Sequence, residues 1–152
     1  MAERLEYWKL APEGIERLRG IGQAVATGSS LEPVLLELVR VLVSRRNGCA
    51  KCTHIHEAEL RKLHEPPARM DGVSEWRGSN AYTQRERAAL AWAEAVTDIQ
   101  NAALREAAKT RVREHFTDAE IANLTLAIAA INAWNRMEIA TGSLAAQEAA
   151  AK

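Results

Sequence analysis

The sequence has few of the residues that interrupt helices. Its 152 residues include 4 prolines and 8 glycines. No stretch shows the alternation of apolar and polar residues that is typical of strands, and no segment repeats at a fixed period. Hydrophobic residues still make up 47% of the chain, which is enough for a substantial core. The composition therefore favours an all-α globular protein.

The chain also has no excess of either charge. Its 20 Lys and Arg residues balance 20 Asp and Glu residues, so the formal net charge is +0. We therefore expect neither nucleic acid nor an anionic membrane as a partner. No apolar run approaches the ~20 residues of a membrane span. The segment Ala2 to Glu6 is charged where a signal peptide would be apolar, so we expect a cytoplasmic protein.

Cysteine is scarce as well. The only two copies, Cys49 and Cys52, stand in one C-x-x-C motif. In a chain without an export signal, this spacing indicates redox or metal chemistry in a reducing compartment and argues against a structural disulfide.

Apolar residues at helical spacing, together with helix-end signals, predict roughly six to eight helices. The expected helices span 12–28, 30–47, 49–63, 83–99, 102–115 and 119–131, with a short helix around 70–76. Three residue pairs fit a capping box at a helix start, namely Ser29 with Glu32, Thr83 with Glu86 and Thr117 with Glu120. We expect residues 1–10 to be a polar lead-in and Ile99 to be buried.

A single domain is expected over residues 1–141, because the chain has the length of one typical domain. Residues 142–152 differ in character. Gly142 and Ser143 precede the segment LAAQEAAAK, which resembles a helical linker of the EAAAK type. We interpret 142–152 as a helical tail, added or engineered, and assign it no function.

The C-x-x-C motif falls at the predicted start of the helix 49–63, directly after Asn47 and Gly48, which form a helix stop. Free N–H groups and the positive end of the helix dipole favour a thiolate at such a position. The spacing of three residues also lets the two sulfurs meet. A thiolate can attack a peroxide or exchange with a disulfide.

His56 and Glu37 are the candidate proton-handling groups. His56 follows Cys52 by four residues and lies on the same helical face, whereas His54 points roughly 160° away at ~100° per residue. A tight turn at Asn47 and Gly48 would bring the helix of Glu37 back alongside His56. Nucleophile, base and orienting acid would then form one relay.

Simpler readings remain for these residues. Glu37 could pair with Arg40 on a solvated helix face. Cys49 and Cys52 could bind zinc together with His54 and His56, although a helix directs the two histidines apart, which makes a closed tetrahedron difficult.

The aromatic and polar residues near the end of the chain need a structural role only. We expect the segment from Trp134 to Arg136 to stabilise the fold without contacting a substrate. We expect Asn132 and Asn135 to act as caps and Arg136 to pair with an acid or a carbonyl at a helix junction.

The spacing of the central motif resembles a known family. Glu37, eleven residues, the segment Cys49 to Cys52, three residues and His56 are similar to the core of the alkyl hydroperoxidase D (AhpD)-like and carboxymuconolactone decarboxylase-like family. Likeness extends to residues 83–94 and 115–136, and it covers roughly 10–140 of the chain.

This resemblance implies a fold and a reaction. The fold would be an AhpD-like helical bundle that forms a trimer or hexamer. Cys52 would attack a small hydroperoxide, Cys49 would resolve the sulfenic acid as a disulfide, and His56 and Glu37 would relay protons. A dithiol, such as a lipoyl group on a partner protein, would restore the thiols. No cofactor or metal is implied.

One position departs from the best-described branch of that family, where a histidine stands in place of Lys51. A related branch decarboxylates a lactone without a redox cysteine pair, and the intact pair here argues against that reaction. Two other functions stay open, a protein disulfide oxidoreductase and a helical oligomer that serves as an assembly scaffold with a vestigial site.

Overall fold

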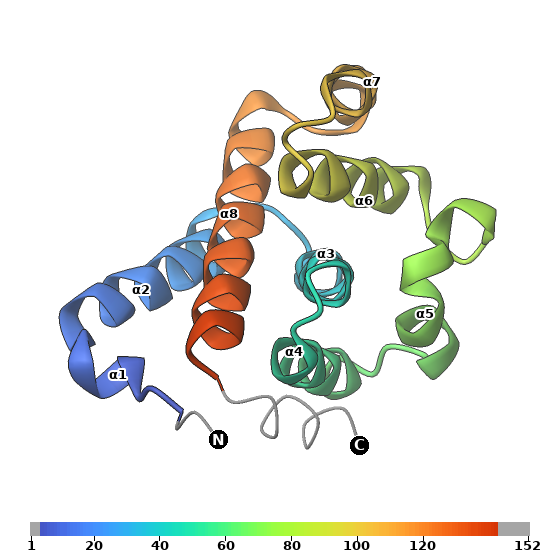
Figure 1. Cartoon of the computed structure of the whole chain (residues 1–152). Coiled ribbons are helices and arrows are strands. Elements are labelled where there is room, and N and C mark those ends of the chain that lie inside the picture. The colour runs from blue at the N-terminus through green and yellow to red at the C-terminus, as the bar shows by residue number, and fades with distance from the viewer. Residues whose placement is uncertain (1–3, 143–152) are drawn as a thin grey trace.

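The computed structural model describes residues 4–142, and this part of the chain is all-helical (Figure 1). It contains eight α-helices, one 3-10 helix and no strand, which confirms the predicted fold class. The elements are α1 (Tyr7–Leu10), α2 (Pro12–Gly28), α3 (Pro33–Arg46), α4 (Ala50–Lys62), α5 (Pro67–Asp71), η1 (Gly72–Gly78), α6 (Gln84–Thr97), α7 (Ala102–His115) and α8 (Asp118–Thr141).

The central element is α3, which Figure 1 shows almost along its axis. It packs against α4, α6, α8 and η1. Its residues 35–39 and 41–44 are buried, so nearly every side of the helix faces other parts of the protein. A helix that is buried all round forms the middle of a helical core, and α3 therefore fixes the position of everything that its side chains carry.

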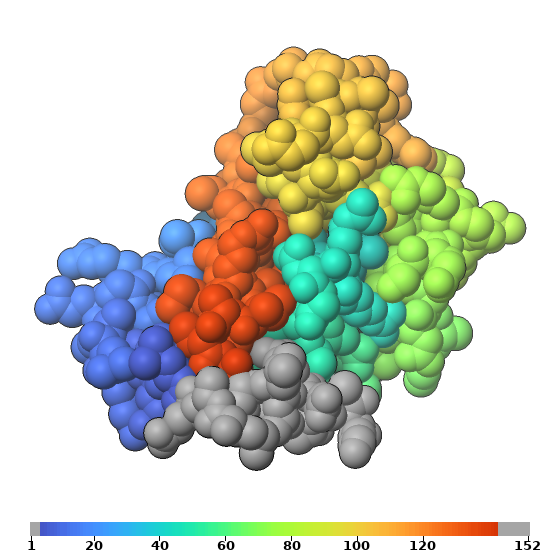
Figure 2. Space-filling view, in the orientation of Figure 1, coloured from blue at the N-terminus to red at the C-terminus, as the bar shows by residue number. Residues whose placement is uncertain are grey.

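The longest helix, α8, covers one side of α3 and also packs against α2 and α6. In the space-filling view its C-terminal half separates the N-terminal helices from the α3–α4 pair (Figure 2). The predicted helix ended at Ile131, but α8 continues to Thr141. It continues because the polar residues of its last turns, among them Asn135 and Glu138, find partners within the protein.

Two predicted capping boxes are present, at Thr83 of α6 and at Thr117 of α8. The third is wrong. Glu32 is the N-cap of α3 and makes no side-chain capping bond. The Ser29 hydroxyl instead donates to the carbonyl of Val25 at 2.6 Å, because Ser29 stands at the end of α2, where free carbonyls need donors.

Three other local expectations need correction or cannot be followed. Ile99 is 61% exposed, because α6 ends at Thr97 and Ile99 lies in the turn that follows. Residues 7–10, expected in a polar lead-in, form the short helix α1, in which Tyr7 is buried. The predicted tail lies outside the described residues except for Gly142, the C-cap of α8. Within residues 4–142, no helix has both the length and the apolar character that crossing a membrane requires.

Candidate active site

The turn between α3 and α4 sets up the site. Asn47 ends α3, and Gly48 follows with φ of +73°, a left-handed conformation that favours glycine. The N–H of Cys49 then donates to the carbonyl of Ser44 at 2.9 Å. This tight connection sends α4 back along α3, as the sequence predicted, and the two helices pack against each other.

Both cysteines lie at the start of α4. Cys49 is the N-cap, and its sulfur accepts a hydrogen bond from the N–H of Cys52 at 3.3 Å. The two side chains are joined by a disulfide, with their Cα atoms 5.3 Å apart. Cys49 is 0% exposed and Cys52 is 6% exposed. The two cysteines are therefore placed for disulfide formation, and Cys52 is the member nearer to solvent.

His56 and Glu37 meet across the hairpin. The Nδ1 atom of His56 lies 2.7 Å from Oε2 of Glu37, and the Arg40 guanidinium donates to the other carboxylate oxygen. Glu37 therefore binds both expected partners, one at each oxygen, but it is buried and does not lie on a solvated helix face. Burial by itself would raise the pKa of Glu37, but the hydrogen bond from His56 and the charge of Arg40 lower this pKa below its usual value.

A network of amide side chains fastens the turn to α8. The Nδ2 of Asn47 donates to Oδ1 of Asn132 at 3.0 Å and to Oδ1 of Asn135 at 2.9 Å. The Nδ2 of Asn135 donates to the buried Ser44 hydroxyl at 3.1 Å. Asn132 and Asn135 are thus mid-helix cross-links between α8 and the turn, and the expectation that they cap a helix is wrong. Arg136 pairs with the carbonyl of Asn132 at 3.1 Å, which is a carbonyl partner as expected, but the contact lies within α8 and not at a helix junction.

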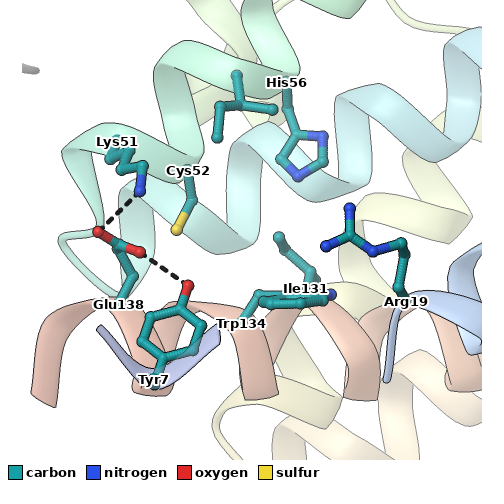
Figure 3. Close-up of a pocket in the computed structure, with 9 residues that line it drawn as sticks. Tyr7, Arg19, Lys51, Cys52, His56, Ile131, Trp134 and Glu138 are labelled. Atoms are coloured by element: carbon teal, nitrogen blue, oxygen red, sulfur yellow. Dashed lines mark hydrogen bonds and ion pairs between the residues drawn. The ribbon is translucent and has the colours of Figure 1, made fainter. Parts of the chain in front are cut away.

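A pocket of about 470 Å³ opens beside the disulfide (Figure 3). Four elements contribute to it: α1, α2, α4 and α8. Cys52 and His56 both line this pocket, and Cys49 is not among its lining residues. The remaining lining residues are Tyr7, Arg19, Lys51, Ile55, Ile131, Trp134 and Glu138. One thiol of the pair and the histidine therefore share one concave, partly apolar space.

Glu138 is the main residue of the pocket that the sequence analysis did not find. It is 4% exposed, and within the described residues it is reached by two donors near the N-terminus and by one on α4. Tyr7 donates its hydroxyl to Oε2 at 2.9 Å, Lys51 Nζ lies 3.1 Å from Oε1, and Arg4 pairs with Oε1. Burial and the hydrogen bond to Glu138 raise the pKa of Tyr7 to about 12.

A signal for Glu138 was present in the sequence. Ile131, Asn135 and Glu138 are spaced by four and three residues, so they share one face of α8, and all three are buried. A charged residue that continues a buried helical stripe needs a partner. Following the helical period beyond Ile131 would have identified Glu138, although not the residues that bind it.

The described residues do not form the zinc site that the sequence left open as an alternative. Residues 4–142 contain no group of three or more His, Cys, Asp or Glu residues placed to hold a metal ion. His54 is exposed on α4, whereas His56 is half-buried and bound to Glu37. The two histidines point apart, as the helical spacing predicted.

The candidate site residues lie within a segment that matches a known protein family. The sequence profile described as the carboxymuconolactone decarboxylase family matches residues 12–95, which include Glu37, both cysteines and His56. The chain belongs to the carboxymuconolactone decarboxylase family. The matched segment ends before α8, so Trp134 and Glu138 lie outside it.

Similarity to other proteins extends over most of the chain. The uncharacterised protein YdfG of Bacillus subtilis (strain 168) is 34% identical over 97% of this chain and 100% of its own length. A crystal structure from Agrobacterium tumefaciens, a protein of unknown function provisionally assigned as an AhpD antioxidant defence protein, has a TM-score of 0.86 and 36% identity, covering 93% of this chain and 97% of that one.

A second crystal structure, described as an alkylhydroperoxidase AhpD core and an uncharacterised peroxidase-related protein from Ralstonia eutropha JMP134, is 26% identical with a TM-score of 0.77. It covers 89% of this chain and 72% of that one. These similarities confirm the AhpD-like fold that the central motif implied.

Proposed function

We propose that this protein is a thiol-dependent peroxidase that reduces small hydroperoxides with Cys52 and Cys49. The observation that carries the proposal is the hydrogen bond between His56 Nδ1 and Glu37 Oε2, 2.7 Å, in a site where His56 and Cys52 line one pocket. An acid that orients a histidine beside a thiol is the arrangement that activates a sulfur nucleophile. Membership of the carboxymuconolactone decarboxylase family and the AhpD-like neighbours support the same chemistry.

The reaction would use the thiol form of the pair. His56 takes the proton of Cys52, and the thiolate attacks the terminal oxygen of the peroxide, R–O–O–H. The S–O bond forms, the O–O bond breaks, and the products are a sulfenic acid on Cys52 and an alcohol. The thiol of Cys49 then displaces hydroxide from that sulfenic acid, which releases water and forms the disulfide seen here.

The burial of the two cysteines supports different roles for them in this scheme. Cys52 lines the pocket and can meet a peroxide there, whereas Cys49 is 0% exposed and sits behind it as the N-cap of α4. A buried thiol within reach of the first sulfur suits the resolving step. Cys52 is therefore the peroxidatic residue and Cys49 the resolving residue.

Small substrates fit this site better than protein substrates. A protein disulfide must approach the attacking sulfur with two bulky chains, but Cys52 is only 6% exposed at the wall of a pocket of about 470 Å³. That volume lies in the range of small-molecule sites. A compact dithiol could enter the same pocket to reduce the disulfide, and a lipoyl group on a partner protein is our first candidate.

We propose that the protein assembles as a trimer or hexamer.

The test is hydroperoxide turnover with dihydrolipoamide as reductant, compared with thioredoxin and glutathione systems. Cys52→Ser should abolish turnover, and Cys49→Ser should accumulate a sulfenic acid that dimedone traps. Full turnover by Cys52→Ser would overturn the proposal. Insulin reduction without peroxide consumption would assign a protein disulfide oxidoreductase, and normal assembly without either activity would leave the scaffold role.

A further inference from the structure

The pocket has a second group of polar residues, which the scheme above does not use. Lys51, Glu138 and Tyr7 lie on one side of Cys52, and His56 lies on the other (Figure 3). The Cys52 sulfur points toward the side of Lys51, Glu138 and Tyr7 in the same view. Cys52 is therefore flanked on both sides by groups that can hold or donate a proton, but the proposed scheme uses only His56.

Contacts with Glu138 and Trp8 hold the Lys51 side chain in place. Its Nζ atom lies 3.1 Å from Oε1 of Glu138 and 5.9 Å from the centre of the Trp8 ring. Glu138 is itself fixed by the Tyr7 hydroxyl and by Arg4. A buried carboxylate with several donors is a costly arrangement that is stable only while those donors stay in place. The ammonium group of Lys51 is thus kept at the pocket wall.

We propose that Lys51 is a catalytic residue that protonates the leaving oxygen of the peroxide, and that Glu138 is the positioning residue that aims it. This inference rests on the proposed peroxidase function. An ammonium group has three N–H donors, so a lysine that binds Glu138 can also donate to a bound oxygen. Lys51 also lines the pocket directly beside Cys52 in sequence and in space.

The proton balance of the attack requires such a donor. When the Cys52 thiolate takes the terminal oxygen, the O–O electron pair stays on the other oxygen, which departs as an alkoxide. An alkoxide is a strong base, so a donor that protonates it during O–O cleavage lowers the barrier. Lys51 gives this proton and the alcohol leaves. The neutral amine regains a proton from solvent through its exposed part, 37% of the side chain, and His56 returns to solvent the proton that it took from Cys52.

Comparing the reaction rates with two oxidants distinguishes protonation of the leaving oxygen from an effect of Lys51 on the thiolate or on the fold. tert-Butyl hydroperoxide releases an alkoxide, which needs a proton. Peracetic acid releases acetate, which does not. In single-turnover measurements of Cys52 sulfenic acid formation, Lys51→Met should slow the reaction with tert-butyl hydroperoxide about a hundredfold, the usual scale of general acid catalysis. The reaction with peracetic acid should keep its rate.

Matched variants complete the test. Lys51→Arg keeps the positive charge but replaces the ammonium by a group that does not release its proton in proteins, so it should show the same selective loss. Glu138→Gln should show that pattern in a weaker form. Lys62→Met removes an exposed lysine of α4 that pairs with Glu59, and it should leave both rates unchanged.

The outcomes decide the inference. Equal slowing with both oxidants would show that Lys51 acts on the thiolate or on the fold, and it would overturn the assignment. No slowing in Lys51→Met, or full rescue by Lys51→Arg, would overturn it as well. Failure of the unaltered protein to consume either oxidant is a different result, because the proposed peroxidase function itself would then be wrong.

Discussion

The two polar sides of the pocket are built by contacts of very different range. His56 and Glu37 are 19 positions apart, in helices joined by one tight turn. Tyr7 and Glu138 are 131 positions apart, at opposite ends of the described chain. The near pair follows from a local hairpin, whereas the far pair exists only after α8 has packed beside the N-terminal helices. One site thus combines a side that the sequence encodes locally with a side that the whole fold must assemble.

The sides should also differ in the step that they serve. In the proposed scheme His56 and Glu37 act on the thiol of Cys52 before it attacks an oxidant, so their loss should affect every oxidant equally. In the proposed scheme Lys51 acts on the departing oxygen and Glu138 and Tyr7 hold Lys51 in place, so their loss should affect only oxidants that release an alkoxide. The comparison of tert-butyl hydroperoxide with peracetic acid therefore measures the division between the two sides directly.

Replacing His56 should have the largest effect. We expect His56→Ala to slow sulfenic acid formation by about 10²–10⁴-fold with both oxidants, because the base that takes the thiol proton is lost. Its pH–rate profile should also change. His54→Ala removes an exposed histidine of the same helix and should change neither rate. An unchanged pH–rate profile in His56→Ala would remove His56 from the relay.

Replacing Glu37 should have an intermediate effect on the same side. Glu37→Gln leaves His56 without its charged partner, and we expect both rates to fall on the order of tenfold to a hundredfold, as when a residue that orients a functional histidine is lost. A fall with only one oxidant would contradict the division described above.

The same variant should change stability with pH. Because the folded protein holds the pKa of Glu37 below its usual 4.5, the ionised carboxylate stabilises the fold above that pH. This stabilisation is lost as the pH falls through the lowered pKa of the folded state. Glu37→Gln should therefore unfold more easily at neutral pH and depend less on pH in acid. Urea unfolding measured in both ranges provides the check.

Replacing Tyr7 should have the smallest effect, on the other side of the pocket. Tyr7→Phe removes one hydrogen bond to Glu138, so we expect about twofold to tenfold slower reaction with tert-butyl hydroperoxide and no change with peracetic acid. The pKa of Tyr7, raised to about 12, keeps the phenol protonated, so the loss should be constant from neutral to mildly alkaline pH. Tyr82→Phe is the matched control, since it removes a hydroxyl bond to the Arg69 carbonyl away from this pocket.

Much of the local structure could be predicted from sequence. The stop at Asn47 and Gly48, the start of α4 at the cysteines and the boxes at Thr83 and Thr117 depend on residues within a few positions of each other. The predictions that were wrong concern the ends of helices, where packing against other parts of the protein decides the structure. The Ser29 hydroxyl donates back to the carbonyl of Val25 in α2 and accepts from the N–H of Leu31 at 3.4 Å, so it does not form the predicted capping box with Glu32.

The sequence by itself determined the hairpin of α3 and α4 and the cysteine pair with its histidine, because helix period and turn chemistry act between near neighbours. It also supplied the acid at Glu37, whose distance from His56 follows from that hairpin. Only the tertiary structure decided that Tyr7 and Glu138 would meet and that Lys51 would join them. No spacing rule reaches across 131 residues, since such a contact depends on how separate helices pack.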